Sequence, residues 1–277
     1  MNLTRRRLSG LLLLSALPVS ALANVRNLTM GLFPNLPADK LISIYQPLAA
    51  YLKQQLNCHI RLASAKDFRS FYQATRNKQF DLIVTAPHFA WLAMTESGYQ
   101  PLASYVHRVA GVFVSRRVSR IINLSSCRNK TIAFTDPLTI VSQLGIRYLQ
   151  SQGMQADIDY HVTTYNNHAN AALAVMLGKA DCAVIGRIPY SQMSADIKKT
   201  LRVIARTNEA PSQFIMSNPD LRSTADIRGA LLNFAKTPTG IAFINEQYIG
   251  GIISAHPDDV APAKPYALIT QRLLSAS

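Results

Sequence analysis

Apolar strand-like segments and amphipathic helix-like segments alternate along most of the chain, and this alternation constrains the fold more than any single motif. The predicted strands cover residues 28–33, 59–63, 80–84, 111–114, 131–134, 160–164, 181–185, 201–205 and 214–216. The predicted helices cover residues 41–56, 68–77, 89–96, 139–152, 167–177, 225–235 and 239–248, and the last two are expected to finish the fold. Such alternation is typical of an α/β protein with mostly parallel sheets and helices packed on them.

A short pattern occurs once in each half of the chain and predicts two similar lobes. Residues 77–82 (Asn-Lys-Gln-Phe-Asp-Leu) and 178–182 (Gly-Lys-Ala-Asp-Cys) both join the end of a helix to an apolar strand that an aspartate opens. We expect residues 25–112 and 210–277 to form one lobe and residues 113–209 the other. Two lobes joined by a few strand crossings make a hinged ligand cleft.

The N-terminus has the features of a secretory signal over residues 1–23. Three arginines (Arg5 to Arg7) precede a short apolar run at 8–17, and Ala21-Leu22-Ala23 supplies small residues for cleavage before Asn24. The apolar run has about half of the ~20 residues that a spanning helix needs, which disfavours the alternative of an uncleaved anchor. The sequence therefore predicts a mature protein in the periplasm, and leaves open whether the arginines direct export by the twin-arginine route.

The mature chain is basic, and its charge favours an anionic partner. Lysine and arginine number 29 against 15 aspartates and glutamates; without the three signal arginines the balance is 26 to 15, a net +11. Because the charges are dispersed and the protein is exported, a small anion is favoured over nucleic acid.

No metal, cofactor or catalytic motif stands out. The three cysteines, Cys58, Cys127 and Cys182, do not have the spacing of a zinc site or of a disulfide framework. Cys182 is expected as a small buried apolar residue, and a bridge between Cys58 and Cys127 is possible but not favoured. The nucleophile-elbow, zinc-protease, P-loop and dinucleotide patterns are absent, so we expect no enzyme and no cofactor.

The order of several motifs adds a specific resemblance. Residues 131–137 (Thr-Ile-Ala-Phe-Thr-Asp-Pro), the helix at 166–175 and residues 178–181 resemble the periplasmic phosphate/phosphite/phosphonate-binding family of ABC transporters. The likeness continues through residues 47–52 and 81–87 and covers nearly the whole mature chain. It implies a two-lobed, type II periplasmic-binding-protein fold, a small oxyanion ligand, an inner-membrane permease as partner, and a monomer. The alternative is a sensory module that reports the same kind of ligand to a membrane sensor kinase.

The predicted anion site lies at the start of the helix over 139–152. Helix N-termini attract anions through unpaired N–H groups and the helix dipole. Thr139 and Ser142 bring two hydroxyls to this start, and the alternative is that they only cap the helix. The family carries a Ser-Thr-Ser-Gly-like run here, whereas this chain has Thr139, Ile140, Val141 and Ser142, so two polar positions are apolar.

The predicted site includes Ile140 beside Thr139 and Ser142, and five further residues complete it, namely Phe68, Thr85, His88, His168 and Arg187. Phe68 stands where the family has a ligand-contacting tyrosine, and His168 matches a family histidine whose charge would switch near neutral pH. Thr85 and His88 follow a strand at the edge where α/β clefts bind ligands. For each histidine the alternative is a residue that only serves the start of a helix.

Two substitutions argue against a ligand with an amine. Arg187 and Gln213 stand near the positions where aminophosphonate binders of this family carry carboxylates. A cation and an amide cannot neutralise an ammonium group. Arg187 is instead suited to a second anionic group, with a solvent-facing loop arginine as the alternative.

Overall fold

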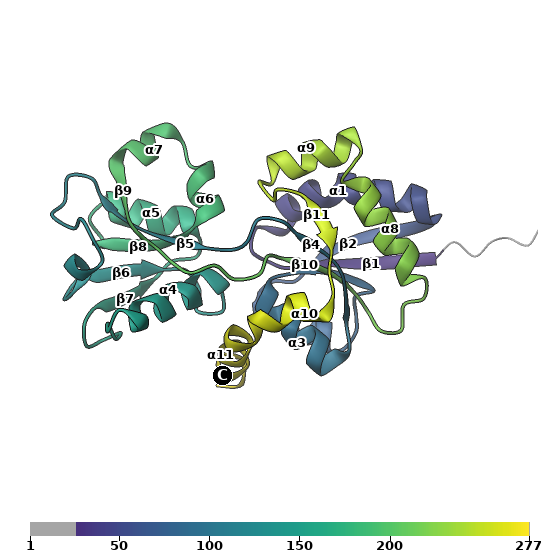
Figure 1. The fold of residues 1–277 in the computed structure, drawn as a ribbon, viewed down its shortest axis with the longest axis horizontal. Helices are drawn as coiled ribbons and strands as arrows, with labels where there is room; N and C mark the ends of the chain where they lie inside the picture. Colours follow the sequence, from purple (N-terminus) through teal and green to yellow (C-terminus); the bar gives the residue numbers. More distant parts are fainter. Residues whose placement is uncertain (1–25, 277) are drawn as a thin grey trace, which may run out of the picture.

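The computed structural model describes residues 26–276, which form two lobes joined by two crossing segments (Figure 1). The sheet of lobe 1 has the strand order β11-β4-β10-β3-β1-β2, and that of lobe 2 the order β7-β6-β8-β5-β9. Lobe 1 contains β1 (Arg26–Leu32), β2 (Cys58–Ser64), β3 (Leu82–Thr85), β4 (Gln100–Tyr105), β10 (Phe214–Ser217) and β11 (Ile252–Ser254). Lobe 2 contains β5 (Gly111–Arg116), β6 (Thr131–Phe134), β7 (His161–Thr164), β8 (Cys182–Gly186) and β9 (Leu201–Arg206). The predicted signal at residues 1–23 lies outside the described residues.

Helices cover both faces of each sheet. Those of lobe 1 are α1 (Ala38–Leu56), α2 (Phe68–Arg76), α3 (Pro87–Ser97), α8 (Thr224–Phe234), α9 (Pro238–Glu246), α10 (Pro257–Val260) and α11 (Lys264–Ser275), with a 3-10 turn at Ala261–Ala263. Those of lobe 2 are η1 (Ser125–Cys127), α4 (Ile140–Ser151), α5 (His168–Met176), α6 (Arg187–Gln192) and α7 (Ala195–Thr200). None of the helices between residues 26 and 276 is long and apolar enough to cross a bilayer.

Strand residues alternate between two cores in each lobe, as the pleat of a strand requires. In β3, Leu82 and Val84 pack with α1 and α8, whereas Ile83 packs with α2 and α3 on the opposite face. In β8, Val184 packs toward α4 and Ile185 toward α5. The short apolar strands are therefore buried on both sides, which is why they appear in the sequence as continuous apolar runs.

The two sheets share one plan. The order β4-β10-β3-β1-β2 in lobe 1 has its counterpart in β9-β5-β8-β6-β7 in lobe 2. In lobe 1, β2 and β3 pair in parallel with β1, and in lobe 2, β7 and β8 pair in parallel with β6. The strands next to the crossings, β10 and β5, pair antiparallel with β3 and β8. Both sheets are mixed and not mostly parallel: among the described residues, three of the five strand pairs in lobe 1 and two of the four in lobe 2 are antiparallel, because the crossing strands bring antiparallel neighbours.

The repeated aspartate has the same role in both lobes. Asp81 accepts a hydrogen bond from the backbone N–H of Thr29 at 2.7 Å, and Asp181 accepts one from the N–H of Thr131 at 2.9 Å. Each carboxylate thus ties the start of one strand to its parallel neighbour, at Thr29 in the middle of β1 and at Thr131, the first residue of β6. The duplicated sequence pattern reflects this structural role and not a ligand contact.

Two segments cross between the lobes, residues 106–110 after β4 and residues 207–213 after β9. They are bridged by a pair of backbone hydrogen bonds between Val109 and Ala210 (3.1 and 2.8 Å) and by the N–H of Gly111, which donates to the hydroxyl of Thr207 at 2.8 Å. Because β5 begins at Gly111 in the sheet of lobe 2, the first crossing ends before residue 112.

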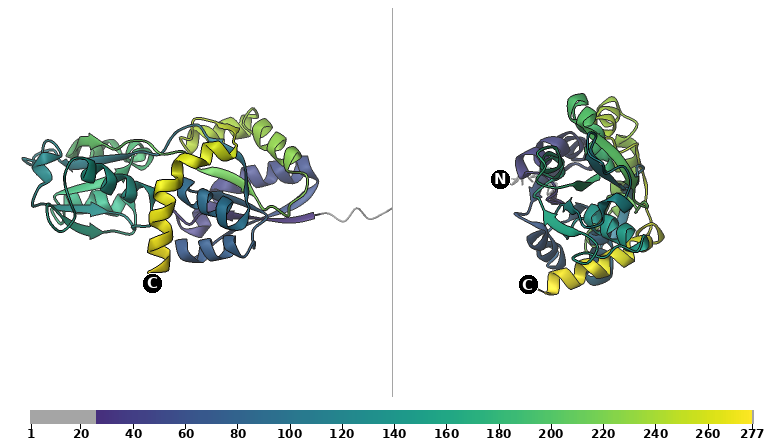
Figure 2. Two further views of the ribbon diagram at one scale, coloured as in Figure 1. Left: turned by 60° about the horizontal axis from the view of Figure 1, so that its bottom comes forward. Right: turned by 90° about the vertical axis from the view of Figure 1, so that its left-hand side faces the viewer.

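The C-terminal part differs from the sequence prediction. Two helices were expected to finish the fold, but β11, α10 and α11 follow them. Helix α11 lies beside the junction of the lobes (Figure 2), where Thr270 accepts a 2.8 Å hydrogen bond from Gln143 of α4 and Tyr266 lies under the guanidinium of Arg147. A segment of lobe 1 therefore also supports lobe 2.

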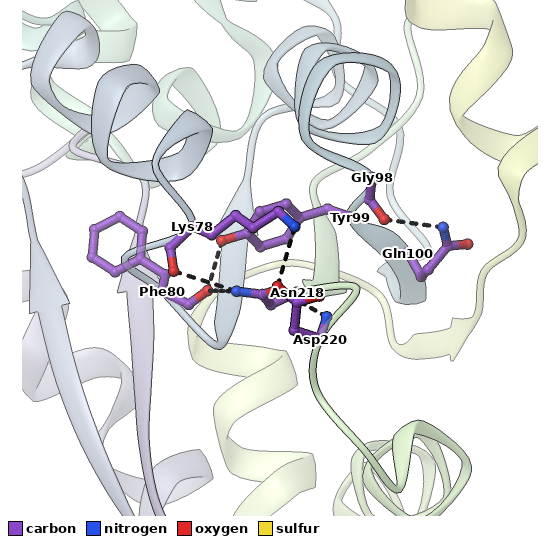
Figure 3. A network of polar contacts seen from close by, with 7 residues as sticks. All are labelled: Lys78, Phe80, Gly98, Tyr99, Gln100, Asn218 and Asp220. Atoms are coloured by element: carbon purple, nitrogen blue, oxygen red, sulfur yellow. Dashed lines mark hydrogen bonds and ion pairs between the residues drawn. The ribbon is translucent and has the colours of Figure 1, made fainter.

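A polar network fastens the returning chain to lobe 1 (Figure 3). The side-chain amide of Asn218, just after β10, donates to the carbonyls of Lys78 and Phe80 at 3.3 Å each, and the hydroxyl of Tyr99 donates to Phe80 at 2.6 Å. Lys78 also pairs with Asp220 at 3.1 Å. These bonds fix the N-terminal end of β3, and Ala86 and Pro87, which follow its opposite end, line a cleft.

Candidate functional site

A cavity of about 270 Å³ lies between the lobes, at the carboxyl ends of the central strands. Residues after β1 and β3 line it from lobe 1, residues after β6 and β8 line it from lobe 2, and both crossing segments contribute. This is the place where ligands bind in α/β sheets, because the loops between strand and helix meet there. Helices α3, α4 and α5 all begin at or beside this cleft, with their positive dipole ends toward it.

The hydroxyls of the predicted anion site bond to one another. Thr139 is the N-cap of α4: its Oγ1 accepts from the N–H of Ser142 at 3.3 Å and donates to the carbonyl of Asp136 at 2.8 Å. Oγ1 of Thr139 and Oγ of Ser142 lie 3.0 Å apart, and both contact the hydroxyl of Thr135. The hydroxyls of Thr139 and Ser142 therefore cap the helix, which is the alternative to anion binding that the sequence left open.

The backbone at this helix start supplies free donors. Ile140 and Val141 follow the N-cap, and both line the cleft. Within residues 26–276 neither N–H has an acceptor, as is normal for the first positions of a helix. On the facing side, α3 begins at Pro87 after Ala86, a residue that cannot cap it with a side chain. The cleft thus has unpaired N–H groups and two helix dipoles, the elements of an anion site.

A small charge cluster borders the cleft. Arg187 donates to Glu209 at 2.6 Å and to the carbonyl of Arg108 at 2.9 Å. Arg108 contacts the same carboxylate at 3.5 Å, so two cations share one acid. Both arginines line the cleft, and the local charge balance is positive. A ligand anion would meet Arg187 in competition with Glu209.

His168 is the first residue of α5 and lines the cleft. Its Nδ1 accepts from the N–H of Gly186 at 3.4 Å, which leaves Nε2 as the protonated nitrogen. Burial lowers the pKa of His168 to about 4. Desolvation therefore favours the neutral ring, against the expected charge switch near neutral pH, and a neutral ring can donate through Nε2.

The wall of lobe 1 is largely apolar. It is formed by Phe33, by Leu41 and Ile44 of α1, and by Ile249. Two buried tyrosines complete it, with the hydroxyls of Tyr45 and Tyr105 2.9 Å apart. Burial raises the pKa of Tyr45 to about 12, so the pair is neutral and one of its protons remains available to a ligand.

Four of the eight predicted residues line the cleft: Thr139, Ile140, His168 and Arg187. The other four do not. Ser142 lies behind Thr139 in the cap, and Phe68 stacks on Phe33 with ring centroids 4.8 Å apart, so it supports the wall from behind.

Thr85 and His88 are fully buried. The Nε2 of His88 donates to the carbonyl of Leu138 at 2.8 Å, which joins the two lobes, and its Nδ1 has no partner within residues 26–276. Burial lowers the pKa of His88 to about 4, so this ring is also neutral. The hydroxyl of Thr85 has no partner in the same part of the chain.

Sequence reasoning missed the tyrosine pair, Arg108 and Val141. Tyr45 and Tyr105 belong to a helix and a strand that meet only in the folded lobe, and each looks like an ordinary core residue. Arg108 lies in a crossing segment whose apolar neighbours resemble a strand. Val141 contributes its backbone N–H, which no side-chain pattern indicates.

This fold and this cleft define a two-lobed solute-binding protein of type II. Residues 30–260 match the family model of the ABC transporter, phosphonate, periplasmic substrate-binding protein, and the chain belongs to this family. The resemblance predicted from residues 131–181 is confirmed. The members of the family are binding components of transporters, not enzymes, and act in the periplasm.

Solved structures of similar fold are consistent with this assignment. PhnD1 from Prochlorococcus marinus in complex with methylphosphonate has a TM-score of 0.76 at 16% identity, covering 90% of this chain and 98% of its own. XAC2383 from Xanthomonas citri bound to ATP has a TM-score of 0.75 at 18% identity, with 90% and 98% covered. A binding protein component of an ABC phosphonate transporter from Pseudomonas aeruginosa has 0.71 at 16%, with 91% and 89% covered. At these identities the likeness concerns the fold.

Proposed function

We propose that this protein captures a small phosphorus oxyanion, of the phosphate, phosphite or phosphonate type, and delivers it to an inner-membrane ABC permease. The observation that carries the proposal is the pair of unpaired N–H groups of Ile140 and Val141 at a capped helix start inside the cleft. Such a start binds an anion without any charged side chain. The rigid hydroxyl cap of Thr139 holds these donors in place before the ligand arrives.

The two walls of the cleft favour an oxyanion that carries an apolar substituent. Lobe 2 presents the N–H groups, the neutral ring of His168 and the cation of Arg187. Lobe 1 presents aliphatic and aromatic surface. We propose that the oxyanion binds lobe 2 and that its substituent contacts the wall around Leu41 and Tyr45. This arrangement favours a phosphonate with a carbon substituent over bare phosphate.

The cleft also disfavours an amine. Within residues 26–276 no carboxylate lines it, and the nearby Glu209 is already shared by Arg108 and Arg187. An ammonium group would lose its hydration without gaining a counter-charge, which costs several kcal/mol in a partly buried site. Gln213, which does line the cleft, offers only a neutral amide.

Isothermal titration of the mature protein tests the proposal. The ligands are methylphosphonate, inorganic phosphate, phosphite and 2-aminoethylphosphonate, with sulfate as a comparison anion. We expect methylphosphonate to bind at least about tenfold more tightly than 2-aminoethylphosphonate, equivalent to ~1.4 kcal/mol. A well-folded protein that binds none of the phosphorus oxyanions would refute the function. Binding of 2-aminoethylphosphonate alone would refute the argument about the amine.

The cellular part of the proposal has three simple tests. N-terminal sequencing of protein from the periplasm should begin at Asn24, and an intact Met1 would contradict export by a cleaved signal. Light scattering should give a monomer. Cross-linking in cells should capture a permease, and capture of a sensor kinase instead would identify the sensory alternative.

A further inference from the structure

Two cysteines of lobe 2 lie in direct contact. The Sγ atoms of Cys127, at the end of η1, and Cys182, at the start of β8, are 2.8 Å apart. Both side chains are fully buried. Cys58, the third cysteine, begins β2 in the other lobe. The sequence spacing of the cysteines gave no reason to pair these two.

The surroundings of the two thiols are apolar in the part of the chain that the structure describes. Cys127 and Cys182 belong to one apolar cluster with Phe113, Ile132 and Val184. Within residues 26–276, the only other polar contact of Cys127 is a weak one to the carbonyl of Asn123 at 3.9 Å. Thiols placed this closely in an oxidising compartment are expected to pair, and the periplasm is such a compartment.

We propose that Cys127 and Cys182 form a disulfide bond in the exported protein. The proposal rests on the periplasmic location but not on the identity of the ligand. The oxidant is a disulfide, either of a thiol–disulfide oxidoreductase or of oxidised glutathione. One cysteine thiolate attacks it, forms a mixed disulfide and releases a thiol; the second cysteine then attacks the mixed disulfide and releases the other thiol. Two electrons and two protons pass from the cysteines to the oxidant.

The bond must form while lobe 2 is still open. The hydrogen bond with Cys127, together with burial, raises the pKa of the Cys182 thiol, and the thiolate is the form that attacks. Once η1 has closed over β8, no oxidant can reach either sulfur. The pairing therefore belongs to the folding of the exported chain, after which the bond ties the loop carrying η1 to the strand that leads to Gly186 and Arg187 at the cleft.

Mass spectrometry of the full exported chain tests this directly. Protein purified from the periplasm without reductant is precipitated in acid, which stops thiol–disulfide exchange, and is then dissolved in denaturant at neutral pH with an excess of N-ethylmaleimide, which reacts with thiolates. We expect one adduct, on Cys58, and an unlabelled mass two hydrogen atoms below that of the fully reduced chain. Reduction before labelling should give three adducts. The Cys58→Ala variant should give no adduct before reduction and two after it.

Three adducts on the unreduced wild-type protein would overturn the proposal. A peptide map that joins Cys58 to either of the other cysteines, or a disulfide-linked dimer, would do the same. A tryptic peptide pair joining Cys127 to Cys182 supports it. The measurement uses no ligand, so its outcome is separate from that of the titrations.

Discussion

Replacement of Ile140 by proline isolates the backbone donor that carries the proposed function. Proline lacks an N–H group and is favoured at the first position of a helix, where that group has no partner in the helix. Ile140 occupies this position in α4. The preceding Thr139 has φ −82° and ψ 140°, the extended conformation that a residue before proline adopts without strain. The Ile140→Pro variant should therefore fold.

The expected loss follows from one hydrogen bond to a charged acceptor. Such a bond contributes roughly 1.5–3 kcal/mol, so methylphosphonate should bind roughly 10- to 150-fold more weakly to Ile140→Pro. The Ile140 side chain is only 7% exposed, and its loss also removes apolar contacts. Ile140→Ala is the matched control, because it removes at least as much apolar surface and keeps the N–H.

Titration calorimetry of the three proteins gives the affinities, and circular dichroism with thermal unfolding confirms that each is folded. The Pro variant should bind at least about tenfold more weakly than the Ala variant, since the difference between them is one charge-assisted hydrogen bond. Equal affinities of the two folded variants would show that the N–H of Ile140 does not contact the oxyanion. The assignment of the anion to the start of α4 would then be wrong.

Other substitutions test the helix cap, the charge cluster and the buried His88 separately. Thr139→Ala should lower the free energy of unfolding by about 1 kcal/mol in urea titrations, because it removes the cap of α4, while Thr139→Ser should keep it. Arg187→Ala should weaken methylphosphonate binding about tenfold, and Glu209→Gln should strengthen it because the carboxylate no longer competes for the guanidinium; opposite signs in calorimetry would contradict the proposed charge cluster. Burial lowers the pKa of His88 in the folded protein from 6.5 to about 4. The neutral ring therefore contributes fully to the free energy of unfolding above pH 6.5, and a contribution on the order of 3 kcal/mol is lost as the pH falls toward 4. In His88→Gln, which keeps a donor for Leu138 but does not titrate, urea unfolding between pH 6.5 and 4 should show a smaller loss.

Much of the fold could be predicted because its signals are local. The strand at residues 131–134 was predicted with its observed bounds, and the start of α4 after Asp136 and Pro137 was placed within one residue. Helix α11 was missed because Pro262 and Pro265 stand at its start and suggest a loop, yet proline is well accommodated in a first helical turn. Strand β4 was missed because a glutamine and a proline open it and polar Ser104 interrupts its apolar run.

The site was less predictable because its geometry depends on contacts between distant residues. Sequence placed hydroxyls at the start of α4, but the inward bonds of Thr139 and Ser142 depend on Thr135 in three dimensions. His88 follows a strand at the expected edge, yet the carbonyl of Leu138 from the other lobe holds its ring away from the cleft. Nothing local in the sequence indicates that partner.

The shared plan of the lobes explains how one architecture yields two different walls. Asp67 and Asn167 cap α2 and α5 in the same way, each accepting from the N–H three residues further on, at 2.7 and 2.8 Å. The next residue is apolar Phe68 in lobe 1 and polar His168 in lobe 2. After the equivalent strands β3 and β8, the helices begin with Pro87 and with Arg187.

The side chains at these paired positions make the two walls of the cleft chemically different. At these positions the caps and strand ends are equivalent, so the difference between the walls there comes from the side chains. Lobe 2 has hydrogen-bond donors and a cation where lobe 1 presents apolar surface or supports it. We therefore expect the proposed oxyanion to bind in one orientation, with its charged end at α4 and His168. A symmetric inorganic anion would leave the apolar wall of lobe 1 without a contact, which is the physical reason to test a phosphonate first.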